Sequence, residues 1–277
     1  MSESGMATTE RILITGAAGG IGMKMRSRLR RPDRVLRLLD LDAVAPPTTG
    51  ELVEIMTGSL TDAATMAAAC QDVDAIIHLG GISREAGWDQ ILAVNVDGTH
   101  TVLEAAQQAG ISRIVLASSN HAVGFRVFGE AGASGVPGTA APLPDTYYGF
   151  SKVAVEALGS LYHSRFGMNV ICVRIGSCFD RPHDVRGLSM WLSPNDCARL
   201  FEACLSVEQP GYRVIWGVSA NTRVAVSLRE ATELGYHSED DSEQFAAEIL
   251  AGRETAQAPM YIGGPFTETP LGKPNPL

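Results

Sequence analysis

The chain of 277 residues is 45% apolar and 19% charged, which is ordinary for a globular protein with a sizeable core and suits one large domain. Its formal net charge of −9 and pI near 5.2 argue against nucleic acid or an anionic membrane as a partner. No apolar run approaches the roughly 20 residues of a membrane helix. The polar stretch 1–10 lacks the features of a signal peptide, so we expect a cytoplasmic protein.

Five cysteines are spread along the chain without a C-x-x-C pair, and their number is odd. This pattern is typical of reduced core thiols in a cytoplasmic protein rather than of a disulfide framework or a zinc site. We therefore expect no disulfide and no bound metal. The thiols belong to Cys70, Cys172, Cys178, Cys197 and Cys204.

The first predicted unit is a strand, a glycine-rich turn and a helix. The apolar run 11–15 ends in the sequence from Gly16 to Gly22, and the helical pattern that follows stops before Pro32. Gly16 can make the tight turn, Gly19 lets the backbone approach a pyrophosphate at the helix N-terminus, and Gly22 permits close helix–strand packing. In this context the G-x-x-G-x-x-G spacing predicts a dinucleotide-binding turn rather than a plain glycine-rich loop.

An acidic residue ends the second predicted strand, which covers 34–39. Asp40 lies about 20 residues beyond the glycines, where a carboxylate binds the ribose hydroxyls of the adenosine moiety. It would repel a 2′-phosphate, so NAD is favoured over NADP as the cofactor. Arg37 on the same strand is expected to point into solvent rather than to bind a phosphate.

Two further strands complete the first half of the predicted sheet. Residues 52–56 form the third strand, and Asp62 opens an Ala-rich helix, where it either contacts adenine or only caps the helix. The apolar run 75–79 is typical of a strand covered on both faces. It ends in Gly80-Gly81, which lets backbone approach the cofactor.

A long helix is predicted from about Trp88 to Ala109. Asn95 lies in its interior, where an asparagine is neutral to unfavourable unless its side chain is bonded, so we expect a buried polar role. On the strand before this helix, His78 is interpreted as a hydrogen-bonded core residue rather than as a ligand.

The fifth predicted strand, 113–117, leads into the polar sequence Ser118-Ser119-Asn120-His121. Polar residues at the C-terminal end of a central strand lie where open α/β sheets bind ligands. A loop rich in Gly, Ala and Pro follows, and Asp145 or Thr146 is expected to cap the next helix.

Tyr148 and Lys152 are four residues apart on one face of that helix. A free phenol has a pKa near 10. A neighbouring ammonium and the positive nicotinamide ring of an oxidised cofactor favour the phenolate. Such a tyrosine can take a hydroxyl proton while hydride leaves the same carbon. A bare Tyr-x-x-x-Lys can equally be an aromatic anchor with an exposed lysine, so the surrounding motifs decide between these interpretations.

The later part of the chain alternates in the same way, and its Pro- and Gly-rich tail from Thr255 is expected to pack as an extended arm. A loop with Arg181, His183 and Arg186 follows the sixth strand. The predicted elements are the strands 170–175 and 212–216 and the helices 194–206, 228–234 and 242–252. Strands that alternate with helices predict an α/β fold with a doubly wound parallel sheet.

Together and in this order, the motifs resemble those of the extended short-chain dehydrogenase/reductase family. They are Thr15 with the glycine turn, Asp40, Asn95, Ser119 and the Tyr148–Lys152 pair. More narrowly, the chain is similar to the bacterial uronate dehydrogenases over nearly its whole length. That similarity rests on the stretches 16–22, 78–83, 117–121, 174–178 and 216–221.

This resemblance implies a Rossmann fold of one continuous globular unit. Residues 1–177 would form the NAD-binding core with the catalytic helix, and 178–277 a smaller substrate-binding portion with a returning strand and a C-terminal arm. It also implies NAD-dependent oxidation of the anomeric carbon of galacturonate or glucuronate to the aldarolactone. The partner would be a small sugar acid, and the protein a homodimer or higher homo-oligomer that pairs the Trp88 and Tyr148 helices.

The resemblance further implies roles for single residues. Tyr148 would deprotonate the anomeric hydroxyl, and Lys152 would lower the Tyr148 pKa and hold the nicotinamide ribose. Ser119 would bond the reacting oxygen, and Asn95 would support Lys152 through a water. Arg186 matches the arginine that grips the C6 carboxylate, a task suited to a bidentate guanidinium. Further substrate contacts are implied for Ser83, Asn120, His121, Ser177 and Phe266. The implied cofactor positions are Gly16, Gly19, Ile21, Gly22, Asp40, Asp62, Leu79, Gly80, Gly81, Lys152 and Ile175.

Two segments depart from the uronate dehydrogenase pattern and bear on the choice of sugar acid. The sequence 223–228 replaces a tryptophan-rich segment, and the loop before Tyr148 lacks the usual aromatic residues. Three alternatives stay open: a dehydrogenase for another sugar or sugar acid, a nucleotide-sugar epimerase or dehydratase, and a non-catalytic dinucleotide sensor. The small C-terminal portion disfavours a nucleotide-sugar enzyme, and the intact catalytic set disfavours a sensor.

Overall fold

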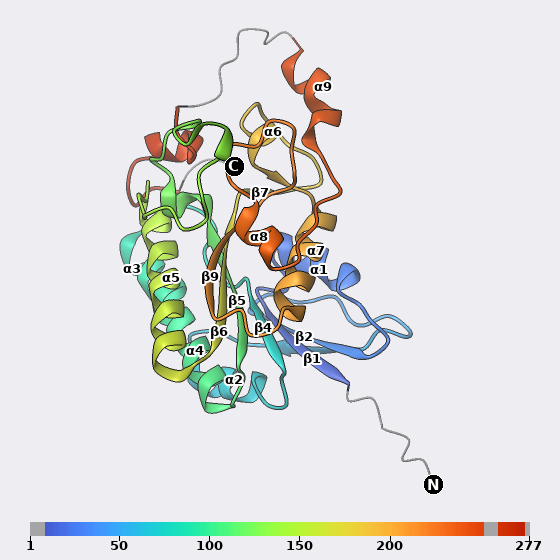
Figure 1. The fold of residues 1–277 in the computed structure, drawn as a ribbon. Coiled ribbons are helices and arrows are strands. Elements are labelled where there is room, and N and C mark those ends of the chain that lie inside the picture. Colours follow the sequence, from blue (N-terminus) through green and yellow to red (C-terminus); the bar gives the residue numbers. More distant parts are fainter. Residues whose placement is uncertain (1–8, 252–259, 275–277) are drawn as a thin grey trace.

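Seven parallel strands form one sheet in the computed structural model, which describes residues 9–251 and 260–274 (Figure 1). Their order is β3-β2-β1-β4-β5-β6-β9, and the first six follow the 3-2-1-4-5-6 order of Rossmann folds. The predicted doubly wound sheet is confirmed, with small shifts at strand ends. The strands are β1 (Glu10–Thr15), β2 (Arg34–Asp40), β3 (Val53–Thr57), β4 (Ala75–His78), β5 (Arg113–Ser119), β6 (Asn169–Ile175) and β9 (Tyr212–Gly217).

Two hydrophobic cores lie on opposite faces of the sheet, as the continuous apolar strands require. Side chains alternate between them: Ile12 and Ile14 of β1 belong to one core and Leu13 to the other. Helices α1 (Gly20–Arg28) and α7 (Pro194–Ser206) pack together beside the first core. Helices α2 (Ala63–Ala69), α4 (Gly98–Gln108) and α5 (Tyr147–Phe166) cover the second (Figure 1).

The long helix predicted from Trp88 to Ala109 is present, but its middle is not α-helical. It runs as α3 (Trp88–Ile91), a π-helical segment (Leu92–Asp97) and α4. A π-helical turn holds an extra residue, so it turns the side chains within it away from the regular α-helical face, and such turns are frequent at functional sites. Asn95 lies inside this segment.

The chain after β6 forms short elements and returns to the sheet through β9. A two-stranded sheet of β7 (Ser177–Cys178) and β8 (Trp191–Leu192) was not predicted. The helix expected at 242–252 starts with a 3-10 turn and lies partly outside the described residues. The expected C-terminal arm lies partly outside the described residues. Its described part, 260–274, packs on the segment 126–128 and contains a 3-10 turn at Gly264–Glu268. The other helices here are α6 (Gly187–Met190), α8 (Arg229–Glu233) and α9 (Ala246–Leu250).

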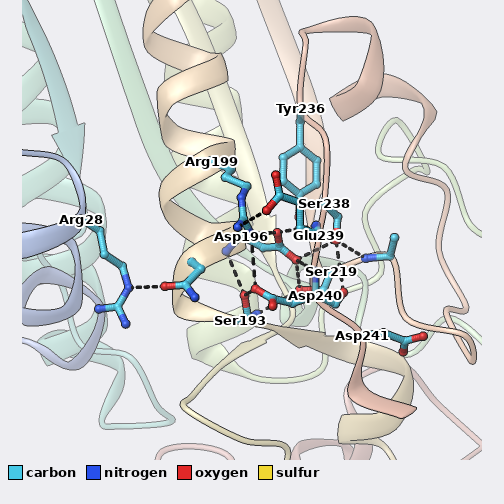
Figure 2. Close-up of polar contacts among 12 residues, drawn as sticks. Arg28, Ser193, Asp196, Arg199, Ser219, Tyr236, Ser238, Glu239, Asp240 and Asp241 are labelled. Atoms are coloured by element: carbon cyan, nitrogen blue, oxygen red, sulfur yellow. Dashed lines mark hydrogen bonds and ion pairs between the residues drawn. The ribbon is translucent and has the colours of Figure 1, made fainter. Parts of the chain in front are cut away.

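A buried carboxylate ties this C-terminal portion together (Figure 2). Asp196, in the first turn of α7, is fully buried and accepts hydrogen bonds from the hydroxyls of Ser219 and Ser238, both at 2.6 Å. It also accepts the backbone N–H groups of residues 239 and 240 and pairs with Arg199 at 2.7 Å. Burial alone would raise the pKa of Asp196, but the donated hydrogen bonds outweigh it and lower the pKa. The loop 236–241 is therefore anchored to α7 and to the end of β9.

The described helices include none that is long and apolar enough to cross a membrane. All five cysteines are buried and unpaired, in agreement with the expected reduced core thiols.

Candidate active site

The glycine turn after β1 has the geometry that its sequence predicts. Gly16 has φ +71°, and a Cβ there would lie 2.6 Å from the backbone nitrogen of Gly80. A Cβ on Gly22 would lie 2.3 Å from the carbonyl oxygen of Gly16. Both contacts are too short for any larger residue, so these glycines bring β1, β4 and α1 into close packing.

The N-terminus of α1 has no side-chain cap among the described residues, unlike those of α2, α5 and α7. Gly19 occupies the cap position and offers no side chain, and the first turn of α1 holds no acidic residue. By contrast, Asp62 caps α2, Thr146 caps α5 and Ser193 caps α7. The first-turn N–H groups of α1 have no intrahelical partner, and they fit the oxygens of a pyrophosphate.

The carboxylate of Asp40 lies beside this turn. Its Oδ2 accepts the N–H of Ala18 at 2.8 Å, and its Oδ1 accepts the N–H of Asp42 at 3.1 Å. Each oxygen keeps a further lone pair, which fits a ribose hydroxyl. Arg37 does not point into solvent as expected: its guanidinium pairs with Glu54 at 2.7 Å and donates to two carbonyl groups. No phosphate-binding cation is therefore offered by Arg37, which agrees with NAD rather than NADP.

The end of β4 is held by a buried chain of hydrogen bonds. His78 Nδ1 lies 2.7 Å from the hydroxyl of Thr15, and its Nε2 lies 3.0 Å from that of Thr99. Burial lowers the pKa of His78 to about 3, so the imidazole stays neutral. The prediction of a satisfied core histidine is confirmed. The same Thr15 hydroxyl accepts the N–H of Gly80 and so fixes the turn that follows the strand.

Asn95 is buried and fully bonded, as expected for a polar residue inside a helix. Its Oδ1 accepts the N–H of Ile82 at 2.7 Å, and its Nδ2 donates to the carbonyl of Ile82 and to the hydroxyl of Ser151. These bonds join the π-helical segment, the loop after β4 and α5. The side chain reaches the neighbour of Lys152 rather than Lys152 itself, so a water-mediated link between Asn95 and Lys152 stays a prediction.

Tyr148 and Lys152 lie on the buried face of α5, next to the end of β5. Thr146 caps the helix by accepting the N–H of Gly149 at 3.0 Å. The Lys152 ammonium lies 5.6 Å from the centroid of the Tyr148 ring and donates to the Ala117 carbonyl at 2.7 Å. The α-helical spacing thus brings phenol and ammonium together, as predicted.

Burial sets the protonation of this pair in the protein alone. It raises the pKa of Tyr148 to about 12, although a hydrogen bond with Ser119 acts in the opposite direction. Burial also lowers the pKa of Lys152 to about 8. In the protein alone the pKa of Tyr148 is thus raised rather than lowered, because loss of hydration has the largest effect on the phenol.

His121 lies beside Tyr148 under the C-terminal segment. Its ring stacks on Phe266 with centroids 3.8 Å apart and meets the Tyr148 ring edge-on at 5.6 Å. Its Nδ1 lies 2.7 Å from the carboxylate of Asp145. Burial lowers the pKa of His121, although Asp145 acts to raise it, so the imidazole is neutral near pH 7.

Arg186 enters the same region from the loop before α6. Its Nε donates to the carbonyl of Ile262 at 2.8 Å. With the Asn120 amide oriented so that its oxygen faces the guanidinium, Nη2 of Arg186 donates to that oxygen at 2.7 Å. The Asn120 nitrogen donates in turn to the carbonyls of Ile175 and Gly176. No described carboxylate forms an ion pair with Arg186, and burial lowers the pKa of its guanidinium. Arg186 is half-buried, and the nearby Asp184 and Asp145 favour its charge without forming an ion pair with it. Such a cation fits an anionic ligand.

The remaining predicted positions lie around these groups, and their ligand contacts stay predictions. Ser83 is exposed, and Ser177 is half-buried with its hydroxyl 3.3 Å from the carbonyl of Met190. Asp62 caps α2, which is the simpler of its two interpretations. Ile21 and Leu79 are half-buried and pack against the first core, to which the buried Ile175 belongs.

Two buried acids near Tyr148 were not singled out from the sequence as site residues. Glu85 is fully buried, and its carboxylate accepts the N–H of Tyr148 at 2.9 Å and that of Gly272 at 2.7 Å. It thereby joins the loop after β4, the start of α5 and the C-terminal segment. Asp145 was considered only as a helix cap, a role that Thr146 fills. Neither acid stands in a motif that could have indicated its contacts.

The segment 223–228, where the sequence departs from the uronate dehydrogenases, packs into a satellite core. Val226 is buried and forms a parallel bridge with Val136, close to Trp216. Arg223 pairs with Glu243 at 2.8 Å.

Comparison with known proteins gives one family. Residues 12–186 match the sequence pattern of the family described as the NAD dependent epimerase/dehydratase family. A uronate dehydrogenase from Pseudomonas putida is 40% identical over 266 residues, which cover 94% of this chain and 97% of that protein. An NAD-dependent glucose-6-phosphate dehydrogenase from Haloferax volcanii is 35% identical, over 86% of this chain and 96% of that protein. The resemblance noted from the motifs is confirmed.

Solved structures agree. A uronate dehydrogenase mutant from Agrobacterium tumefaciens in complex with NAD superimposes with a TM-score of 0.86 at 36% identity, covering 94% of this chain and 98% of that one.

Proposed function

This chain belongs to the NAD-dependent epimerase/dehydratase family, and we propose that it is a uronate dehydrogenase that oxidises the anomeric carbon of a hexuronic acid to the aldarolactone. Arg186 is the residue that points to a sugar acid as the substrate. Its half-buried guanidinium forms no ion pair with a described carboxylate, and it acts on His121, which contacts Tyr148 of the Ser119–Tyr148–Lys152 set. A sugar acid supplies both the missing anion and a hydroxyl to oxidise.

The cofactor is NAD, and the described residues fit it. The uncapped start of α1 suits the pyrophosphate, and the free lone pairs of Asp40 suit the adenosine ribose. The closely packed Gly16 and Gly80 leave the backbone edge clear of side chains. When bound, oxidised NAD supplies the hydride acceptor and a positive charge near Tyr148.

The protein's own groups manage the proton. Tyr148 accepts the proton of the anomeric hydroxyl as the hydrogen on the same carbon leaves as hydride, so the hemiacetal becomes a lactone carbonyl. Ser119 holds the reacting oxygen, and its hydrogen bond favours the tyrosinate. Lys152 holds the nicotinamide ribose, while its bond to Ala117 fixes its direction.

Arg186 selects the acid. Of the five N–H groups of a guanidinium, the described bonds use one on Nε and one on Nη2, so Nη1 and the second hydrogen of Nη2 remain for a carboxylate. That geometry suits bidentate binding. Asn120 supports the clamp through its amide oxygen.

A hexose phosphate is the second candidate substrate. The specific observation is the Haloferax volcanii relative, which is a glucose-6-phosphate dehydrogenase. Glucose 6-phosphate also carries an anion on C6, and an unpaired guanidinium binds phosphate as well as carboxylate.

Reduction of NAD by the purified protein tests these alternatives. The panel is galacturonate, glucuronate, their neutral parent aldoses and glucose 6-phosphate. We expect turnover of the uronates alone. Turnover of glucose 6-phosphate would instead identify a hexose phosphate as the substrate. Turnover of the neutral sugars as fast as that of the uronates would show that Arg186 does not select an anion.

We further propose that the chain divides into a cofactor-binding and a substrate-binding portion and that the protein is cytoplasmic. Residues 1–177 would hold NAD and the catalytic helix, and 178–277 would contribute Arg186, Ser177 and Phe266 to the substrate. Five unpaired thiols support a cytoplasmic protein.

We also propose a homodimer or a higher homo-oligomer built on α3 and α5. Trp88 is 41% exposed and Phe150 39%, with their rings 5.4 Å apart, and Leu161 and Phe166 of α5 are also exposed. Exposed aromatic and aliphatic residues grouped on neighbouring helices are typical of a protein interface. Light scattering on a Trp88→Glu variant, with a monomer as the expected result, tests this.

A further inference from the structure

We propose that Asp145 is a positioning residue that fixes His121 in its Nδ1–H tautomer, so that His121 presents a neutral Nε2 acceptor to a hydroxyl group of the substrate. The identity of that substrate as a sugar acid rests on the proposed function. The tautomer itself does not, and it can be tested separately.

The bonds of Asp145 determine which nitrogen of His121 carries the hydrogen. The Asp145 side chain is fully buried, and its Oδ2 lies 2.7 Å from His121 Nδ1. Its Oδ1 accepts a hydrogen bond from the hydroxyl of Thr146 at 2.9 Å. The oxygen of that hydroxyl accepts the N–H of Gly149, and its hydrogen is donated to Asp145. Both carboxylate oxygens thus act as acceptors, so Nδ1 has to be the donor.

Three glycines close around the Asp145 carboxylate. A Cβ would lie 1.9 Å from its Oδ2 at Gly124, 2.0 Å from it at Gly263, and 2.8 Å from its Oδ1 at Gly149. These glycines belong to the turn after β5, the C-terminal segment and the start of α5. A side chain at any of the three positions would collide with the carboxylate and displace it, so the glycines leave the space in which Asp145 reaches the imidazole.

The other nitrogen of His121 points away from Asp145 across the ring. No described residue forms a hydrogen bond with Nε2. It is not fully buried either, because the only buried side-chain nitrogen and oxygen atoms without a partner in the described residues are Arg126 Nε and Glu230 Oε2. The stacked Phe266 and the edge-on Tyr148 hold the ring, so Nε2 is open to a ligand next to the Tyr148 phenol.

The charges around His121 keep it an acceptor. Asp145 favours the imidazolium, while burial and the positive charge of Arg186 disfavour it, and burial has the largest effect. The phenol of Tyr148 is the other titratable group that packs on the ring. A neutral Nε2 accepts a hydroxyl and repels a carboxylate, whereas Arg186 attracts the carboxylate. The two side chains thus orient a sugar acid, with its acid group at Arg186 and a hydroxyl at His121.

The tautomer can be read from ¹⁵N-histidine NMR of the full-length protein. The His121 signal is assigned by its absence in His121→Gln. We expect the wild-type protein at neutral pH to show hydrogen on Nδ1 and a free Nε2. A wild-type His121 with hydrogen on Nε2 would overturn the proposal, and this measurement needs Asp145 unchanged.

The variant Asp145→Asn keeps the volume that the glycines enclose. Its amide nitrogen can donate to Nδ1, so we expect a shift toward the Nε2–H tautomer, with the signal of the buried His78 unchanged as an internal control. Hydrogen bonding to the substrate hydroxyl is then lost, and kcat/KM for the uronate should fall by up to about 100-fold. NAD affinity should stay at the wild-type value.

A double-variant cycle separates positioning from a merely structural role. If Asp145 acts through His121, adding Asp145→Asn to His121→Gln should cost little more than His121→Gln alone. Losses that multiply, or an Asp145→Asn protein with unchanged tautomer and unchanged kcat/KM, would contradict the inference. If wild-type protein oxidises no uronate, the proposed function fails while the NMR result still decides the tautomer.

Discussion

Replacing Arg186 by methionine removes the guanidinium and its charge and keeps an unbranched stem like that of arginine. The described bonds leave one N–H group on Nη1 and one on Nη2 to donate to the two oxygens of a substrate carboxylate. Hydrogen bonds to charged groups contribute about 1.5–3 kcal/mol each, so two of them contribute about 3–6 kcal/mol. At about 1.4 kcal/mol per factor of ten, Arg186→Met should lower kcat/KM for uronates by about 100- to 10,000-fold.

The assay compares each uronate with its neutral parent aldose at saturating NAD. The neutral sugar has no carboxylate to lose, so its low activity should change little, and the preference for the acid should collapse. Arg186→Lys should recover part of the activity because it keeps the charge without the planar fork. The matched control is Arg181→Met, since Arg181 is nearby in sequence but exposed and paired with Glu248.

Two results would refute this reasoning. One is an Arg186→Met protein with an unchanged preference for uronates over neutral sugars. The other is an equal loss for acid and neutral sugar, which would mean that Arg186 acts only by holding the C-terminal segment through Ile262.

Three further predictions follow from the same contacts. Tyr148→Phe should lower kcat by about 100- to 10,000-fold, while the affinity for NAD, measured by calorimetry, stays near the wild-type value. Loss of both turnover and NAD binding would show that Tyr148 has a structural role. Asp40→Asn should weaken NAD binding and narrow the gap between NAD and NADP, and an unchanged NAD/NADP ratio in kcat/KM would remove Asp40 from cofactor choice. For His78, the folded pKa of about 3 lies below the ordinary value near 6.5, so the unfolded chain takes up a proton first as pH falls. Stability should therefore drop below pH about 6.5, by up to about 1.4 kcal/mol per pH unit. The His78→Gln protein should be less stable at pH 7, but its free energy of unfolding in urea should fall less between pH 7 and pH 5 than that of the wild type. An equal fall in both proteins would assign the acid sensitivity to other groups.

The sheet and the cofactor side of the site could be predicted from the sequence because their signals are local. An apolar run, a glycine turn and a helical pattern follow one another within each strand–helix unit. The Tyr148–Lys152 pair needs only the period of a helix, and Asp40 needs only its place after β2. Each of these depends on residues close together in the chain.

The substrate side depends on contacts between distant segments, which no local pattern records. Glu85 bonds to Tyr148 and to Gly272, 187 positions away. Asp145 reaches His121 through a space that glycines from three segments leave free. The ion pair that turns Arg37 away from solvent joins two strands in register. The role of Arg186 rests on resemblance alone, and only the fold shows that no described carboxylate forms an ion pair with it.

Transfer of deuterium from C1 to the cofactor distinguishes oxidation of the anomeric carbon from reactions at other carbons. The protein is given NAD and glucuronate or galacturonate with deuterium on the anomeric carbon, and the reduced nicotinamide is examined by mass spectrometry. A dehydrogenase acting at C1 predicts one deuterium in each molecule of reduced cofactor formed, together with lactone in equal amount. Reduced cofactor without deuterium would place the oxidation at another carbon, and a changed sugar without net reduction of NAD would indicate an epimerase or dehydratase instead.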